Sequence, residues 1–209
     1  LSVVIILIQV MSAWWSVAFS ISRTTATLIG KALAEGRSLD VKLYIKLTLI
    51  NILLEAVPLA MVSYLLRENL VRIFQDDPEV VHLFSTTFWL ACLGLTANHF
   101  QTTMTQGVLI AFGEQSFIAW TWSIACYGVA LPFILFTIFL SDLGIIGIFL
   151  GWIISDVIIF ILALVKISRT DIDGEIEKSR QRVSKTTHDS SENVASRGGF
   201  DNPVYKAER

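Results

Sequence analysis

The stretch VVHLFSTTFWLACLGLTANHFQTTMTQGVLIAFG, residues 80–113, contains no Asp, Glu, Lys or Arg. A helix needs about 20 apolar residues to cross the hydrocarbon core of a bilayer, so this stretch is long enough to span one. Four further stretches have the same character, and Glu55 and Asp156 are their only charged residues: 1–22, 47–66, 115–141 and 143–165. The sequence therefore predicts an all-α integral membrane protein.

The organisation follows from these apolar stretches. Of the 209 residues, 54% are hydrophobic, and the polar remainder is concentrated in the connections and in the last part of the chain. We predict a membrane fragment over residues 1–167 and a disordered tail over 168–209, which is polar and lacks hydrophobic periodicity. The predicted transmembrane helices cover residues 2–29, 43–66, 80–111, 116–140 and 144–165.

The chain begins at Leu1, inside an apolar helix, without a basic region or cleavage site before it. We therefore expect no signal peptide, and we interpret the chain as the C-terminal part of a longer protein that is inactive as a fragment. Cys92 and Cys126 lie inside apolar stretches, which favours small core side chains over a disulfide or a metal site. We expect no cofactor and no nucleic-acid partner.

Basic residues predict the orientation in the membrane. If five spans alternate, the first and third connections and the tail share one side, whereas the second connection holds only Arg67 and Arg72. The basic residues on the first side are Lys31, Arg37, Lys42, Lys46, Lys166, Arg169, Lys178, Arg180, Arg182 and Lys185. The positive-inside rule makes that side, and the tail, cytosolic.

A charge at mid-bilayer costs at least about 2.5 kcal/mol, so each buried charge is a candidate for function. Glu55 precedes Pro58, which removes a backbone donor and allows the helix to kink beside the carboxyl. The carboxyl is a candidate binding group for a proton or a cation. The alternative is a protonated glutamate that bonds to a neighbouring helix.

The second half of the 80–111 helix is unusually polar. Its polar residues are Asn98, His99, Gln101, Thr102, Thr103, Thr105 and Gln106. Asn98, Thr102 and Thr105 share one face, and His99, Thr103 and Gln106 share the adjacent one, so this surface should line a cavity or a helix interface. His99 is the strongest candidate, because an imidazole can gain or lose a proton near neutral pH. The alternative is a neutral histidine that is hydrogen-bonded between helices.

Three other features are candidates. Asp156 lies near the midplane among aliphatic neighbours and must face the helix bundle. Arg23 lies about 9 Å from the predicted cytosolic end of its helix, so its side chain can snorkel to the interface. Trp14 and Trp15 lie deep in the first helix, where they either pack or stack on an organic cation.

The order of several motifs resembles that of the multidrug and toxin extrusion transporters of eukaryotes, over about residues 16–172. The matching segments are IGKALAEG at 29–36, IFQDDPEV at 73–80, GVLIAFGEQ at 107–115, YGVALP at 127–132 and LGIIGIFLG at 143–151, followed by RTD at 169–171. The resemblance implies the C-terminal lobe of a twelve-helix, two-lobe antiporter that exports organic compounds against protons or sodium. The N-terminal lobe and the seventh helix would be missing.

The resemblance also implies buried glutamates at two positions that Gln9 and His99 occupy here. An amide cannot titrate, and a protonated histidine adds positive charge. Three alternatives to the export of organic cations stay open. The substrate could be neutral or anionic, the coupling could use His99, Glu55 or Asp156, or the protein could be a poorly active member of the family. The candidate residues for substrate binding and ion coupling are therefore Gln9, Trp14, Trp15, Glu55, Asn98, His99, Gln101, Thr102, Tyr127 and Asp156.

The tail contains an F-x-N-P-x-Y signal formed by Phe200, Asn202, Pro203 and Tyr205. Asn-Pro favours a turn that presents the tyrosine to an endocytic adaptor, which would indicate a plasma-membrane protein. Two other classes of protein stay open: a non-transporting receptor or scaffold that acts through this tail, and an acyl-transfer enzyme in which Asn98 assists His99.

Overall fold

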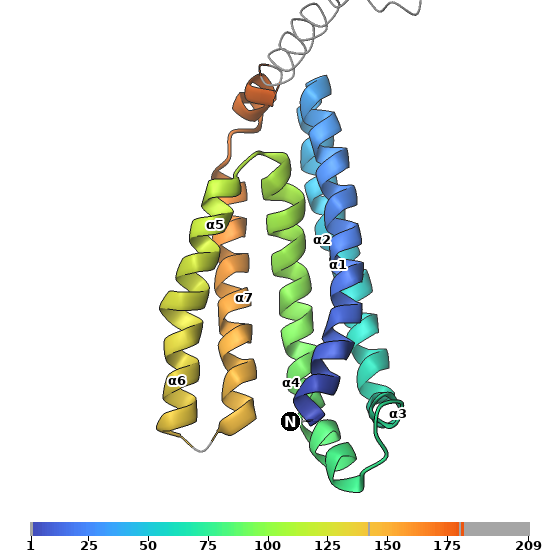
Figure 1. Cartoon of the computed structure of the whole chain (residues 1–209). Coiled ribbons are helices and arrows are strands. Elements are labelled where there is room, and N and C mark those ends of the chain that lie inside the picture. Colours follow the sequence, from blue (N-terminus) through green and yellow to red (C-terminus); the bar gives the residue numbers. More distant parts are fainter. Residues whose placement is uncertain (1, 142, 180, 182–209) are drawn as a thin grey trace, which may run out of the picture.

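A computed structural model describes residues 2–141, 143–179 and 181, and this part of the chain is helical, without strands. Five helices are long and apolar enough to cross a membrane, which confirms the predicted fold class (Figure 1). These spans are Ile5–Glu35, Ser38–Leu65, Pro78–Leu109, Gln115–Phe139 and Ile146–Arg169.

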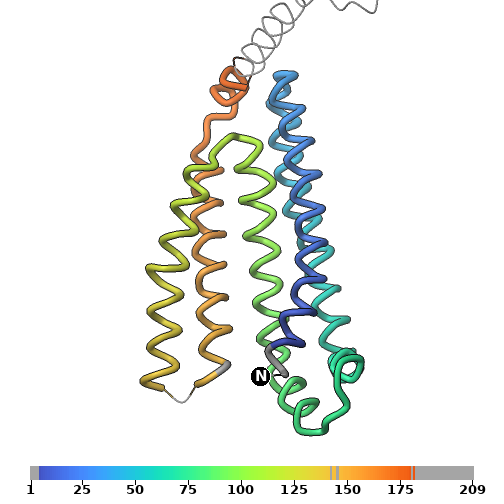
Figure 2. Tube along the Cα trace, viewed as in Figure 1, coloured from blue at the N-terminus to red at the C-terminus, as the bar shows by residue number. Residues whose placement is uncertain are grey.

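Within the described residues, the five spans are built from six α-helices and two π-helical segments, and a seventh, short α-helix lies on the second connection. The elements in chain order are α1 (Ser2–Glu35), α2 (Ser38–Leu65), α3 (Arg67–Arg72), α4 (Pro78–Thr102), η1 (Thr103–Leu109), α5 (Gln115–Ser123), η2 (Ile124–Ala130), α6 (Leu131–Phe139) and α7 (Gly144–Arg169). The third span is α4 continued by η1, and the fourth is α5, η2 and α6 joined end to end, as the trace in Figure 2 shows.

Several helices are longer than predicted. The first was expected to end at residue 29 and the second to begin at 43, but only Gly36 and Arg37 separate α1 from α2. Hydropathy marks where a helix leaves the hydrocarbon, whereas the backbone hydrogen bonds continue into the polar region. Gly36, with φ of 75°, ends α1, and Arg37 pairs with Glu35 and Asp40 across the turn.

The helix α4 begins with a capped, acidic turn. Asp77 is the N-cap residue, and its Oδ1 accepts a hydrogen bond of 2.9 Å from the backbone N–H of Glu79. Pro78 occupies the first helical position, where its missing N–H costs nothing. The short helix α3, on the preceding connection, was not predicted.

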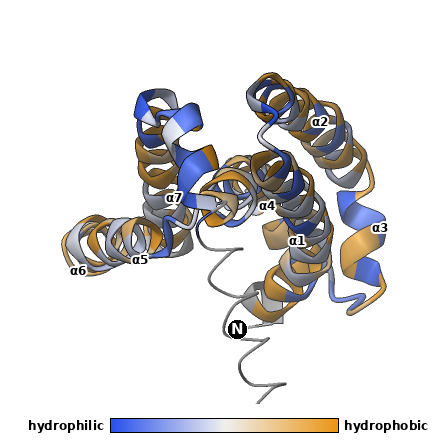
Figure 3. Cartoon of the chain, turned by 90° about the horizontal axis from the view of Figure 1, so that it is seen from above, coloured by the Kyte–Doolittle hydropathy of each residue, from blue (hydrophilic) through white to orange (hydrophobic). Residues whose placement is uncertain are grey.

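The helix α4 is central to the fold. It packs against α1, α2, α3 and α7, whereas η2 and α6 pack mainly against α7. Figure 3 shows this arrangement from above, with α4 between the α1–α2 pair and the group formed by α5, α6 and α7. The polar residues in the second half of the third span are therefore enclosed by other helices.

The π-helical segments could not be predicted from hydropathy, which is insensitive to the number of residues per turn. In η1, Gly107 lies against α1, and a Cβ there would be 3.1 Å from Thr25 Cγ2. The helix α7 also lies close to α6 and η2, since a Cβ at Gly151 would be 2.5 Å from Ile134 Cγ1 and 3.4 Å from the carbonyl oxygen of Ala130. Small residues allow such close packing between helices in membranes.

The ends of the helices alternate as the orientation argument assumed. In Figure 1, the α1–α2 turn, the η1–α5 turn and the end of α7 lie at one end of the bundle, and α3, the end of α6 and the start of α7 lie at the other.

The predicted start of the disordered tail, at residue 168, is too early. The helix α7 continues to Arg169, and residues 172–179 are also helical. Ile176 is only 8% exposed and belongs to the same buried cluster as Val41 and Ile118. Ile172 and Ile176, one helical turn apart, pack this segment against the bundle. Composition alone did not reveal this contact.

Candidate functional site

The candidate site lies at the middle of α4, where polar side chains meet α1, α2 and α7. His99 is only 1% exposed, and Gln101, Thr102 and Thr105 are also buried. Three neighbouring helices contribute one group each, namely Trp14 of α1, Glu55 of α2 and Asp156 of α7. The polar face predicted from helical periodicity is therefore an interface among four helices.

His99 is held on one side by α1. Its Nε2 lies 3.2 Å from the backbone carbonyl oxygen of Trp14, and the two rings meet edge to face with centroids 5.8 Å apart. A carbonyl oxygen only accepts hydrogen bonds, so Nε2 must carry a hydrogen. In the neutral imidazole, the other nitrogen, Nδ1, then has a free lone pair.

That lone pair faces Glu55. Nδ1 of His99 is 3.6 Å from Oε2 of Glu55, which is too long for a hydrogen bond but within the range of an ion pair. Nδ1 and both carboxyl oxygens of Glu55 are enclosed and have no hydrogen-bond partner among the described residues. A lone pair opposite a carboxylate is repulsive, and one proton, on either group, makes the contact attractive.

A second polar network lies on the α7 side of α4. Asn98 donates from Nδ2 to Oδ2 of Asp156 at 3.2 Å, and the Thr102 hydroxyl donates to Oδ1 of Asn98 at 3.4 Å. The Gln101 amide donates to the Thr105 hydroxyl at 3.2 Å. Asp156 thus faces the bundle, as expected, and its partner is an amide rather than a cation.

Three candidates lie away from this site. Gln9 is exposed on α1, Trp15 is exposed and packs against Phe19 with ring centroids 5.6 Å apart, and Tyr127 of η2 is 74% exposed. Trp14 and Trp15 point in different directions, so they cannot stack on one cation. Adjacent residues on a helix lie about 100° apart, which makes this separation predictable.

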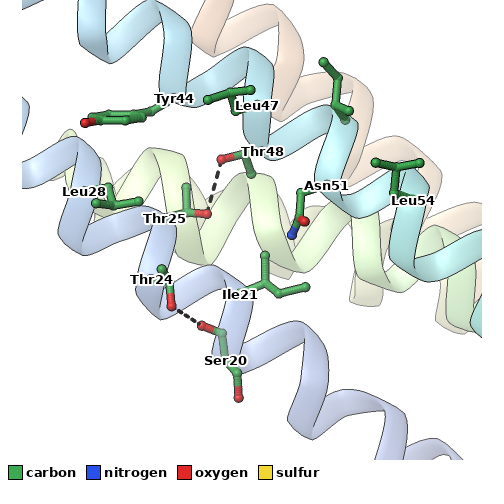
Figure 4. Close-up of a pocket in the computed structure, with 11 residues that line it drawn as sticks. Ser20, Ile21, Thr24, Thr25, Leu28, Tyr44, Leu47, Thr48, Asn51 and Leu54 are labelled. Carbon is green, nitrogen blue, oxygen red and sulfur yellow. Dashed lines mark hydrogen bonds between the residues drawn. The ribbon is translucent and has the colours of Figure 1, made fainter.

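Sequence reasoning missed two features. The Trp14 carbonyl was not a candidate, because no side-chain pattern marks a backbone oxygen that will meet a histidine from another helix. The structure also has a groove of about 560 Å³ between α1 and α2, bounded by the hydrogen bond between the Thr25 and Thr48 hydroxyls at 3.2 Å (Figure 4). Asn51 and Tyr44 line this groove, which does not include His99.

The enzyme interpretation required Asn98 to assist His99. In the structure, Asn98 bonds to Asp156 and Thr102, whereas His99 contacts Trp14 and Glu55. The expected pairing is therefore wrong, because neighbouring positions on a helix point to different partners. Phe200, Asn202, Pro203 and Tyr205 of the tail signal lie outside the described residues.

Comparisons with known proteins agree with the fold. The MatE family model matches residues 1–136. Protein DETOXIFICATION 41 of Arabidopsis thaliana is 25% identical over 186 residues, covering 88% of this chain and 36% of that protein. Protein DETOXIFICATION 15 of the same plant is 26% identical over 173 residues, covering 83% of this chain and 36% of that protein.

A solved structure, the crystal structure of the eukaryotic MATE transporter AtDTX14, superimposes with a TM-score of 0.81 at 18% identity. The match covers 87% of this chain and 40% of that chain. The chain therefore spans little more than a third of the length of the relatives it matches, and it shares the fold of the corresponding part of the transporter.

Proposed function

The chain belongs to the MatE family, and from that premise we propose that it is the C-terminal lobe of a secondary transporter that exports organic compounds. The transport is driven by exchange for protons or cations. The substrate site lies between this lobe and an N-terminal lobe of the same protein, and access to it alternates between the two sides of the membrane.

The contact between His99 and Glu55 carries the proposal. Because Nε2 of His99 is occupied by the Trp14 carbonyl, a proton that binds to this pair lies between Nδ1 and the carboxyl of Glu55. Binding it removes one net negative charge from the interior and draws α4 and α2 together. Releasing it leaves a carboxylate opposite a lone pair, which drives the two helices apart.

The protein has elements that can respond to this change. Pro58 lies one turn after Glu55 inside α2 and cannot donate to the carbonyl of Leu54, so α2 can bend beside the carboxyl. On α4, the π-helical segment η1 begins one turn after His99. Such wide turns often occur at functional positions in helices.

Asp156 and Asn98 are the second coupling pair in this proposal. They join α7 to α4, whereas Glu55 and His99 join α2 to α4. A movement of α4 would therefore change the distance within both pairs. An amide partner can bond to either form of the carboxyl, so sodium or a proton could be exchanged at Asp156.

The placement in the cell follows from the basic residues and the tail. We propose that the end of the bundle that carries the α1–α2 turn faces the cytosol, where the F-x-N-P-x-Y signal can meet an endocytic adaptor. The protein then resides in the plasma membrane of a eukaryotic cell. Truncation after Arg197 should increase its abundance at the cell surface, and unchanged abundance would contradict the adaptor.

Transport explains the site better than catalysis does. A general base needs an accessible substrate, but His99 is enclosed and its contacts are a backbone carbonyl and a carboxyl. The family match also favours transport.

The test uses the natural full-length protein in sealed vesicles. An imposed pH gradient should drive the movement of organic probes of several charge types, and Glu55→Gln should remove the dependence on the gradient. Glu68→Gln, which changes an exposed glutamate of α3, is the matched control. Absence of gradient-driven flux across the whole panel would contradict the proposed function.

A further inference from the structure

Arg23 is a cation inside a membrane-spanning helix, and its guanidinium has no ion pair or hydrogen bond with any described residue. The helix α1 continues to Glu35, but hydropathy places the end of the first span near residue 29, so the guanidinium can reach the membrane interface by snorkelling. Arg23 is also exposed, so it requires either water or a partner outside the described chain.

The face of α1 that carries Arg23 is polar along much of its length. It lies opposite the buried side formed by residues such as Leu7, Trp14 and Ala18. Ser12, Ser16 and Ser20 on this face satisfy their hydroxyls by donating to backbone carbonyls of the preceding turn. The guanidinium of Arg23 has no such internal partner, which makes this face unsuitable for contact with lipid tails alone.

Arg23 also lines a pocket. A hollow of about 440 Å³ between α1 and η1 is lined by Phe19, Arg23 and Thr27 on one side and by Gln106 and Ile110 on the other. The pocket thus combines a guanidinium, a carboxamide, a hydroxyl, an aromatic ring and aliphatic surface. A guanidinium and a carboxamide together match the geometry of a planar anion such as a carboxylate.

The charges around the pocket favour the same ligand. None of its lining residues is acidic. The sequence has no Asp or Glu before Glu35, and none between residues 80 and 113. A cation without neighbouring acids, in surroundings of low dielectric constant, attracts anions and repels cations.

The position of Gln106 connects the pocket to the proton site. Gln106 lies in η1, which continues directly from the helix that carries His99. The pocket and the His99–Glu55 contact therefore lie on one continuous helical span, and both include residues of α1. A shift of this span would therefore displace Gln106 in the pocket and His99 in its contact with Glu55.

We propose that Arg23 and Gln106 bind the carboxylate or sulfonate group of an organic anion whose aromatic body lies against Phe19. This inference names the substrate class of the transporter and so rests on the proposed function, although the binding itself does not require transport. The same anionic chemistry is offered by the headgroup of an acidic lipid, and the experiment must separate the two.

The test measures equilibrium binding of naphthoate to the purified full-length protein in vesicles of phosphatidylcholine alone, which contain no acidic lipid. Naphthylmethylammonium, of similar size and opposite charge, is the comparison ligand. Arg23→Gln should weaken naphthoate binding by about ten-fold, and Gln106→Glu, which places a carboxylate in the pocket, should weaken it at least as much. Arg23→Lys should retain part of the affinity.

The control variant is Arg67→Gln, because Arg67 is a cation that lies over the Tyr64 ring, away from this pocket. It should leave naphthoate binding unchanged. Equal affinity of the native protein and Arg23→Gln for naphthoate would overturn the proposal. So would a protein that binds no naphthoate in phosphatidylcholine but holds phosphatidylglycerol through Arg23, since Arg23 would then be a lipid contact.

The two proposals fail in different ways. Arg23-dependent naphthoate binding without any gradient-driven flux would contradict the transporter and leave the anion site in place. Gradient-driven flux of cations alone, unaffected by Arg23→Gln, would support the transporter and overturn the anion site.

Discussion

His99 and Glu55, from α4 and α2, face each other with Nδ1 and Oε2 3.6 Å apart, and neither atom has another hydrogen-bond partner in the described part of the chain. The Trp14 carbonyl fixes the hydrogen on the opposite nitrogen, Nε2. In the proposed mechanism this contact takes up a single proton, and because it joins α2 to α4, a change in its charge would act on both helices.

Replacing Glu55 by Gln should uncouple the protein from the pH gradient. The amide of the variant can donate to Nδ1 of His99 permanently, which imitates the protonated state. We expect the gradient-driven component of the flux to be lost, because the variant cannot take up and release the proton. Flux measured at several imposed pH differences checks this. A variant that still responds to the gradient as the native protein does would rule out Glu55 as the coupling group.

Replacing Asn98 by Leu should destabilise the fold. The variant leaves the Asp156 carboxyl without its donor and the Thr102 hydroxyl without one acceptor. A buried polar group that loses its partner costs about 1–3 kcal/mol, so thermal unfolding in detergent should occur at a lower temperature. Asp156→Asn keeps an acceptor for the Asn98 amide and should be milder. If Asn98→Leu unfolds at the same temperature as the native protein, the network has no structural role.

Replacing Gly151 by Val should disturb the packing of α6 on α7. A Cβ at this position would lie 2.5 Å from Ile134 Cγ1 and 3.4 Å from the Ala130 carbonyl oxygen. Overpacking of this kind costs about 1–3 kcal/mol, measured as loss of thermal stability. Gly30→Val is the matched control, because nothing lies within 4 Å of a Cβ there. Equal losses in the two variants would mean that the close approach is not what matters.

The fold could be predicted from the sequence because a bilayer imposes simple rules. Length and the scarcity of charge identify each span, and the capped start at Asp77 follows from local chemistry. Helix ends such as Glu35 and Arg169 were placed too early, because hydropathy changes at the membrane surface and not where hydrogen bonding stops. The π-helical turns depend on how neighbouring helices pack, and no local pattern encodes them.

The candidate site could be predicted only in part. Helical periodicity identified His99 and Asn98 as members of enclosed faces, and the cost of a buried charge identified Glu55 and Asp156. Neither argument revealed that His99 lies between Glu55 and a backbone carbonyl. That pairing depends on the relative rotation of α1, α2 and α4, which the sequence of one helix does not specify.

A cysteine at position 102 should report the movement of the central helix. Thr102 is buried between α4 and its neighbours, one turn from Asn98, so a water-soluble thiol reagent should reach it only when the bundle opens. Native Cys92 is buried and Cys126 is half-buried, so both should first be replaced by serine. In that background, we expect Thr102→Cys to react faster at a pH that removes the proton from the His99–Glu55 contact, because repulsion between Nδ1 and the carboxylate then separates α2 from α4. Adding Glu55→Gln should leave only the rise with pH that formation of the thiolate itself causes. The same pH dependence of labelling with Glu55 and with Gln at position 55 would show that the proton does not control the opening of this site.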